Sequence, residues 1–344
     1  MPHSFRFEPP SPQPGAVTRP RLLRTLLGRW ESRVTSVIGG PGLGKTTLLA
    51  QSIAENRLAP RGEDVWLGVE VADADADNLA RDLLRALEPP VPSAGGGRRA
   101  APPDDAPVDV RAIADAVWRR APAQVCLHLD NVHLVPEDSP GATWLAALID
   151  TLPANGHVLL SSRGALPVAV VRLAASGALL RIDEADLRFS DDELAGFAQR
   201  RGVDPRRMAA TGGWPAMAEL AASVEGDLTG EYLWEEVLRP LGEERRRALA
   251  VLCDLGGADD DLASAALGTR VDLAEALAGV PLVAVGGDGW WEPHQLWQTV
   301  RALRLPPDER AAARRRAVAH LTGRDRFDDA IVVAHDAGLD DLVP

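Results

Sequence analysis

Lysine is almost absent from this chain, and several other features are scarce as well. Of the 37 lysine and arginine residues, only Lys45 is a lysine. The two cysteines, Cys126 and Cys253, stand far apart in apolar surroundings, which excludes a disulfide scaffold and predicts two buried, reduced thiols. No apolar run is long enough for a signal peptide or a membrane span, so we expect a soluble, cytoplasmic protein with no membrane partner.

Positive charge is in deficit too. The formal net charge is -13 at pH 7. Nucleic acids and anionic membranes attract basic surfaces, so this balance argues against broad, nonspecific binding to either. With 344 residues, 46% of them hydrophobic, the chain is long enough for two or three globular domains.

The single lysine lies inside a glycine-rich motif, G-x-x-x-x-G-K-[ST], which is the pattern of a phosphate-binding loop, or P-loop. A compact ammonium on a flexible stem can fold back onto phosphates that backbone amides already enclose, whereas a planar guanidinium cannot. The residues expected to bind the nucleotide phosphates are Gly40, Gly42, Leu43, Gly44, Lys45, Thr46 and Thr47.

The motif has the flanking elements that a P-loop requires. The β-branched run 34–38 predicts a buried parallel strand before it, and residues 46–53 have apolar positions at helical spacing after it. The helix would direct its positive end at the phosphates. The Thr46 hydroxyl would bind Mg²⁺, and Thr47 would contact the α-phosphate.

Strand and helix patterns alternate up to about residue 188, which predicts an α/β domain with a parallel sheet covered on both faces. A segment rich in Pro, Gly and Ala at 88–107 is expected to form a surface loop. The expected strands are 34–38, 65–69, 124–130, 157–161 and 179–182.

Beyond residue 188 the strand pattern gives way to helices. Ser190 and the acidic residues 191–193 predict a helix start. Two apolar runs around 286–289 predict a β-hairpin, and helices followed by a hairpin and another helix are typical of a winged helix. The predicted fold is thus a P-loop NTPase parallel-sheet domain followed by a small helical domain and a winged-helix domain. The predicted divisions are an extended lead-in (1–16), the nucleotide-binding domain (17–188), a helical lid (189–228), the winged helix (229–322) and the start of a helical arm (323–344).

A second candidate site element is the apolar strand that ends in Asp130. A carboxylate at the carboxyl end of a parallel strand would face the P-loop and hold Mg²⁺ together with Thr46, as in a Walker B element. The alternative is an ordinary aspartate that caps a turn. His133, three residues further on, either contacts the site or caps the following loop.

In these motifs the chain resembles the STAND class of signal-transduction NTPases, and within it the MalT-type large ATP-binding regulators of the LuxR family. The resemblance spans nearly the whole chain, and it depends on the order and spacing of short motifs. They lie at 18–23, 39–46, 129–133, 159–163, 186–189, 213–215 and 293–296.

The resemblance implies roles for residues in these motifs. Arg19 and Pro20 would lie near the adenine, and Arg163 would sense the nucleotide phosphates. Pro215 would pack near the base or ribose, and His294 would contact the β-phosphate of ADP. For the last three, the alternatives are a surface arginine, a helix-start proline and a polar residue at the base of a helix.

One position departs from the family pattern. The family usually has a second acid after the magnesium-binding aspartate, and this chain has Asn131 there. An amide can orient water but cannot accept its proton. The candidate catalytic residues are therefore Lys45, Asp130, Asn131 and Arg163, with slow ATP hydrolysis at most.

The resemblance implies a nucleotide switch. ADP would hold a closed resting state in which Pro215 and His294 bridge the domains through the ligand, and ATP would favour self-association. DNA binding would come from a helix-turn-helix that this chain lacks. Two other interpretations stay open: an AAA+-like ATPase motor or loader, which predicts vigorous turnover, and an interaction scaffold with a vestigial site, which predicts no nucleotide binding.

Overall fold

The computed structural model separates into two compact units, residues 1–189 and 190–344, and each is described by itself. The expected surface loop lies outside the described residues except for Glu88, and so does the end of the predicted arm, from residue 336. The described residues are 4–11, 16–88, 109–209, 211–223, 228–286, 289–294, 297 and 300–335.

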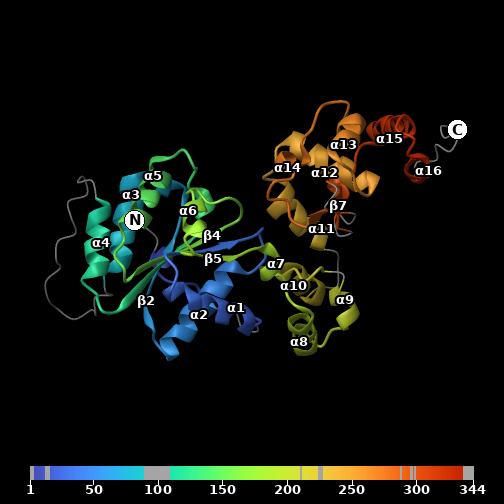
Figure 1. Ribbon diagram of the computed structural model, residues 1–344. Coiled ribbons are helices and arrows are strands. Elements are labelled where there is room, and N and C mark those ends of the chain that lie inside the picture. Colours follow the sequence, from blue (N-terminus) through green and yellow to red (C-terminus); the bar gives the residue numbers. More distant parts are fainter. Residues whose placement is uncertain are drawn as a thin grey trace. The chain divides into compact units, whose positions relative to one another are not determined.

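Five parallel strands form the sheet of the first unit, in the order β2-β3-β4-β1-β5 (Figure 1). All the expected strands are present, which confirms the prediction of an α/β domain with a parallel sheet. The largest difference is at β2, which begins three residues early because Gly62 and Asp64 pair with β3 although neither carries an apolar signal. The strands are β1 (Val34–Ile38), β2 (Gly62–Gly68), β3 (Gln124–Asp130), β4 (Gly156–Ser162) and β5 (Leu179–Ile182).

The strand order places β4 between β1 and β3. Ile38 at the end of β1 pairs with Ser162 of β4, and Leu129 of β3 pairs with Leu160 of β4. Parallel strands present their carboxyl ends at one edge of the sheet, which is where ligands bind in open α/β folds. The loop after β1, the end of β4 and the end of β3 therefore meet at that edge.

One face of the sheet packs against an apolar layer. Leu127 and Leu129 of β3 are fully buried there with Leu79 and Leu83 of the neighbouring helix layer. Each such leucine stabilises the fold by about 1.5–3 kcal/mol relative to an exposed position. The helices of this layer are α3 (Ala76–Leu87), α4 (Val110–Trp118) and α5 (Pro140–Thr151).

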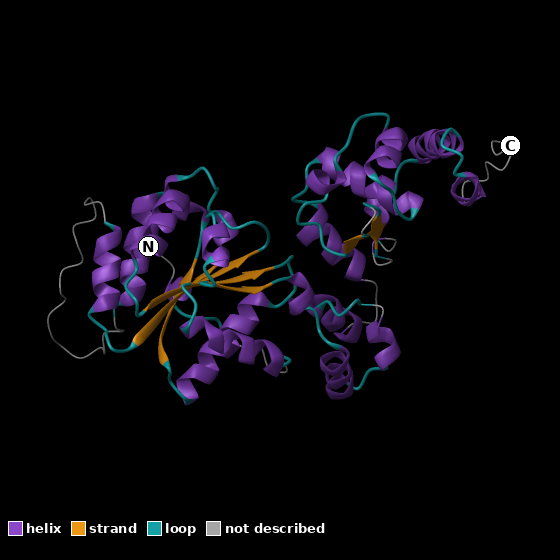
Figure 2. Ribbon diagram, viewed as in Figure 1, coloured by secondary structure: helices purple, strands orange, loops and turns teal. Residues whose placement is uncertain are grey.

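Helices α1 (Pro20–Leu26) and α2 (Lys45–Leu58) cover the opposite face, so that the strands lie between two helical layers (Figure 2). Two short helices flank the edge strand β5 in the sequence: α6 (Val171–Ala175) precedes it and α7 (Glu184–Leu187) follows it. Within the described ranges, no helix is both long and apolar enough to cross a bilayer.

The second unit is mainly helical. Its first helix, α8 (Asp191–Arg201), begins with a capping box: the Ser190 hydroxyl accepts from the Glu193 amide at 3.3 Å, and the Glu193 carboxylate accepts from the Ser190 amide at 3.0 Å. This confirms the predicted helix start. The later helices are α9 (Pro205–Ala209), α10 (Pro215–Ser223), α11 (Leu228–Leu233), α12 (Glu243–Leu255), α13 (Asp260–Leu267), α14 (Leu273–Ala276), α15 (Pro307–Thr322) and α16 (Phe327–His335).

A two-stranded hairpin interrupts these helices, as predicted. Strands β6 (Val283–Val285) and β7 (Trp291–Pro293) pair antiparallel, with Val285 opposite Trp291. Gly289 in the connection has a φ of 80°, a left-handed conformation that favours glycine. The pairing confirms the hairpin, while the winged-helix assignment and the finer domain limits stay predictions.

Candidate functional site

The glycine-rich loop joins β1 to α2 at the carboxyl edge of the sheet. Gly42 and Gly44 have φ values of 74° and 73°, which side chains with a Cβ rarely adopt. The Lys45 ammonium folds back and donates hydrogen bonds to the carbonyl oxygens of Gly39 at 2.6 Å and Gly40 at 2.8 Å. With only 7% of Lys45 exposed, the loop encloses a positive point charge.

The enclosure changes the acidity of this ammonium. The pKa of Lys45 is lowered to about 8, first by burial and then by the charge of Arg163, while Asp130 and Glu184 act in the opposite direction. An anionic ligand beside the loop would favour the charged ammonium. The loop is therefore suited to a polyphosphate group.

A pair of oxygen donors lies next to the loop. The Thr46 hydroxyl donates to Oδ2 of Asp130 at 2.7 Å, and the Ser161 hydroxyl at the end of β4 donates to Oδ1. Hydroxyl and carboxylate oxygens are ligands that Mg²⁺ prefers. Thr46 and Asp130 thus fit the donor set of a magnesium-bound nucleotide, and they would hold the ion beside the phosphates.

Arg19 ties three backbone carbonyls together. Its guanidinium donates to the carbonyl oxygens of Leu43 at 3.2 Å, Gly44 at 2.8 Å and Leu187 at 2.9 Å. Arg19 is only 2% exposed, and a Cβ on Gly44 would lie 2.9 Å from its terminal nitrogen. The side chain therefore fixes the P-loop to α7, while its expected place near the adenine, with Pro20 at the start of α1, stays a prediction.

Sequence reasoning did not find Glu184, which also contacts the loop. The Gly40 amide donates to one carboxylate oxygen at 3.3 Å, and Arg188 donates to the other at 3.0 Å. Glu184 is 144 residues from Gly40, and no local pattern marks it. Ser161 was also missed as a partner of Asp130, although it lies inside one of the motifs that the sequence singled out.

The remaining predicted residues of the first unit lie around this edge. Arg163 follows β4 and is exposed, and its positive charge acts on both Lys45 and His133. Asn131 follows Asp130 in a left-handed conformation with a φ of 65°, and its backbone N–H donates to the Ser161 hydroxyl at 3.2 Å. Thr47, the third residue of α2, is half-buried.

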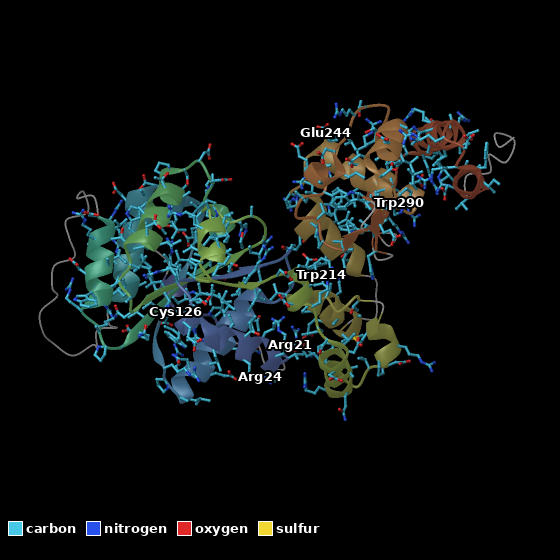
Figure 3. All side chains as sticks on the ribbon, viewed as in Figure 1. Arg21, Arg24, Cys126, Trp214, Glu244 and Trp290 are labelled. Atoms are coloured by element: carbon cyan, nitrogen blue, oxygen red, sulfur yellow. The ribbon has the colours of Figure 1, made fainter. Side chains whose placement is uncertain are left out.

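Pro215 and His294 belong to the second unit. Pro215 begins α10 after two glycines with positive φ, and Trp214 beside it is 1% exposed and packs edge-on against Tyr232 (Figure 3). The His294 amide donates to the Leu282 carbonyl at 2.8 Å, which fixes its backbone at the end of the hairpin. Their bridging role through a ligand stays a prediction.

A second polar cluster lies inside the sheet, away from the P-loop. Asp64 accepts from Arg29 at 3.3 Å and from Asn56 at 2.7 Å, and it lies 2.7 Å from the ring nitrogen Nε2 of His128. Burial raises the pKa of Asp64, but the bond with His128 and the charge of Arg29 outweigh it, so the pKa lies below its ordinary value. The buried carboxylate is thus compensated by its neighbours.

Cys126 (Figure 3) completes this cluster. Its sulfur atom lies within 4.8 Å of a carboxylate oxygen of Asp64 and of a ring nitrogen of His128, so the three groups could in principle hold a metal ion. Burial raises the pKa of the Cys126 thiol, which opposes metal binding because only the thiolate is a good ligand. Arg29 already supplies the positive charge that Asp64 requires, so we treat the cluster as structural. Both cysteines are free, as predicted, but Cys253 is only half-buried.

Strand order, glycine-rich loop and the aspartate at the end of β3 together define a P-loop NTPase fold. A solved structure agrees with this: the Walker-type ATPase PABY2304 of Pyrococcus abyssi covers 84% of this chain and 96% of its own, with a TM-score of 0.55 at 14% sequence identity. No protein-family model matches the chain.

The chain is similar in sequence to two kinds of curated protein. It is 25% identical over 344 residues to the HTH-type transcriptional regulator MalT of Vibrio parahaemolyticus, with 89% of this chain and 37% of MalT covered. It is 29% identical over 350 residues to the serine/threonine-protein kinase PknK of Mycobacterium tuberculosis, with 92% of this chain and 31% of PknK covered. The chain thus spans about a third of these relatives, and the likeness to MalT-type regulators that the motifs indicated is confirmed.

Proposed function

We propose that this chain is the ATP- and ADP-binding switch module of a STAND-type transcriptional regulator. ADP would hold the resting state, ATP would drive self-association, and hydrolysis would be slow. DNA binding would belong to a region outside this chain. The sequence likeness to MalT over nearly the whole chain supports the regulatory context.

The observation that carries the proposal is the enclosed Lys45 ammonium beside the Thr46 and Asp130 pair. A point charge held by loop carbonyls, at the start of a helix of 14 residues, offers a site for phosphates. The adjacent hydroxyl and carboxylate offer a site for the accompanying Mg²⁺. Denaturing the purified protein and identifying the nucleotide it releases tests the proposal directly, and ADP is the expected result.

Turnover separates the proposal from an AAA+-like motor. A motor requires vigorous steady-state hydrolysis, whereas Asn131 deprives this site of the usual second acid. We expect tight nucleotide binding with slow turnover. Rapid, sustained hydrolysis would favour the motor, and failure to bind any adenine nucleotide would favour a scaffold with a vestigial site.

The dependence of ATP binding on Mg²⁺ should require the Asp130 carboxylate. We expect Asp130→Asn to weaken ATP binding about tenfold in the presence of Mg²⁺ and to leave binding in excess EDTA almost unchanged, because an amide is a poorer ligand for a hard cation. Calorimetric titration with and without EDTA measures this difference. Asp115→Asn, at an exposed position of α4, is the matched control, and equal magnesium dependence in both variants would remove Asp130 from the metal site.

The resting state should depend on His294. We expect His294→Ala to raise the ADP dissociation rate about tenfold and to increase self-association without added ATP, because the variant loses a contact made only in the closed state. Stopped-flow release of a fluorescent ADP analogue and light scattering measure the two effects. His320→Ala, on α15, is the control. An unchanged ADP off-rate in His294→Ala would exclude this histidine from the switch.

A further inference from the structure

The residue that follows Asp130 in the candidate site, Asn131, is not an acid. Hydrolysis joins the water oxygen to the γ-phosphorus, breaks its bond to the β–γ bridging oxygen and releases a proton that some acceptor must take. Asn131 is an amide and cannot accept it. A slow ATPase at this site therefore needs a different acceptor.

The nearby carboxylates are already engaged. Asp130 accepts from Thr46 through one oxygen and from Ser161 through the other, and it is the expected magnesium ligand. Glu184 accepts from the Gly40 amide through one oxygen and from Arg188 through the other. Both oxygens of each carboxylate are therefore occupied by hydrogen-bond donors.

His133 differs from these groups. It lies in the short 3-10 turn Val132–Leu134 that directly follows Asp130 and Asn131, at the carboxyl end of β3. Its ring nitrogen Nδ1 is buried and has no hydrogen-bond partner among the described residues. Leaving a buried nitrogen without a hydrogen-bond partner costs free energy of folding. A water molecule in the candidate site would supply that partner by donating a hydrogen bond to Nδ1.

Charged groups of the candidate site act on the His133 imidazole. The charges of Arg163 after β4, of Lys45 in α2 and of Asp130 in β3 all act on His133. The pKa of His133 is lowered to about 4, first by burial and then by Arg163 and Lys45, while Asp130 acts in the opposite direction. The imidazole is therefore neutral at pH 7, which is the form that can accept a proton.

We propose that His133 accepts the proton of the attacking water in this chain, in place of the carboxylate that Asn131 lacks. The inference rests on the proposed function, since it assumes that MgATP binds at the P-loop. The proton passes to Nδ1, phosphate and ADP form, and the imidazolium then returns the proton to solvent. The charges of Arg163 and Lys45 disfavour the imidazolium, so turnover through this acceptor is expected to be slow.

The test compares binding with single-turnover hydrolysis in the intact chain. His133→Gly should lower the single-turnover rate at saturating MgATP about a hundredfold or more, while the Kd for ATP stays within about twofold, since a general base acts on the chemical step. His133→Gln retains a side chain that can orient water but not accept its proton, and it should be as slow as His133→Gly. His320→Ala should hydrolyse at the wild-type rate.

Two rescues distinguish a proton acceptor from a structural residue. Free imidazole should restore hydrolysis to His133→Gly in proportion to its neutral form. Asn131→Asp, which supplies a carboxylate, should restore the rate in the His133→Gly background. Wild-type rates in His133→Gln, no rescue by either route, or ATP binding without hydrolysis in the wild type would each overturn the proposal. Absence of ATP binding in the wild type would instead overturn the proposed function on which it depends.

Discussion

Lys45→Ala is expected to abolish measurable binding of ATP and ADP. The variant removes a buried ammonium that the Gly39 and Gly40 carbonyls hold over the loop. A hydrogen bond to a charged group is worth about 1.5–3 kcal/mol, and the ammonium would contact more than one phosphate oxygen. At about 1.4 kcal/mol per tenfold change, affinity should fall about a hundredfold or more.

Isothermal titration calorimetry of the purified chain measures this loss. Lys45→Arg is the more specific variant, because it keeps the positive charge but replaces the compact ammonium by a planar guanidinium. We expect its nucleotide affinity to be nearly as low as that of Lys45→Ala. Arg57→Ala, at an exposed position on the same helix α2, is the matched control and should bind as the wild type does. Wild-type affinity in Lys45→Ala would place the nucleotide elsewhere.

The fold of the first unit was predictable because its signals are local. Apolar, β-branched runs mark β1 and the core of β3, and the G-x-x-x-x-G-K-T pattern fixes where the strand ends and the helix begins. The pairing of Thr46 with Asp130 follows from the same logic, since Thr46 begins the helix after the P-loop and Asp130 ends β3, both at the carboxyl edge of the parallel sheet. The largest error was at the start of β2, where Gly62 and Asp64 pair with β3 although neither has an apolar side chain, and the end of β2 and both ends of β4 differ by one residue.

The contacts that hold the loop were not predictable for a related reason. Glu184 meets Gly40 across 144 residues, and Arg19 meets Leu187 across 168 residues. When only the sequence neighbours are known, a charged residue at the start of a helix or just before one is expected to be an ordinary solvent-exposed side chain. The same holds for Asp64, whose partners Arg29 and His128 come from a different turn and a different strand.

The contacts of Glu184 and Arg19 join the P-loop to the segment that follows β5. Glu184 and Leu187 belong to α7, which ends just before the first unit does, at residue 189. A Cβ on Gly39 would lie 2.9 Å from the Leu187 side chain and 3.4 Å from the Glu184 backbone, so the loop and α7 are in close contact. The loop and α7 thus form one contact region, and in the sequence α7 is followed by the second unit.

Arg19→Ala is accordingly expected to destabilise the first unit and to weaken nucleotide binding together. The variant leaves the carbonyls of Leu43, Gly44 and Leu187 without their guanidinium partner in a buried setting. Gly44 keeps its hydrogen bond from the Leu48 amide, and the other two carbonyls each lose a bond to a charged group that is worth about 1.5–3 kcal/mol, so the summed loss is about 3 kcal/mol or more. For a unit of this size that corresponds to a fall in melting temperature of about 6–12 °C.

Thermal unfolding followed by circular dichroism, with ATP titration well below the melting temperature, measures both effects. Arg24→Ala is the matched control, because Arg24 lies on the same helix α1 and makes one exposed bond of 3.3 Å to the Pro20 carbonyl (Figure 3). The melting temperature of Arg19→Lys should lie between those of Arg19→Ala and Arg24→Ala, since an ammonium lacks the planar fork with which the guanidinium reaches three carbonyls. An unchanged melting temperature with weakened binding would show that Arg19 acts on the nucleotide directly, as the family resemblance implies. An unchanged affinity at a lowered melting temperature would show that the P-loop holds its shape without the clamp to α7.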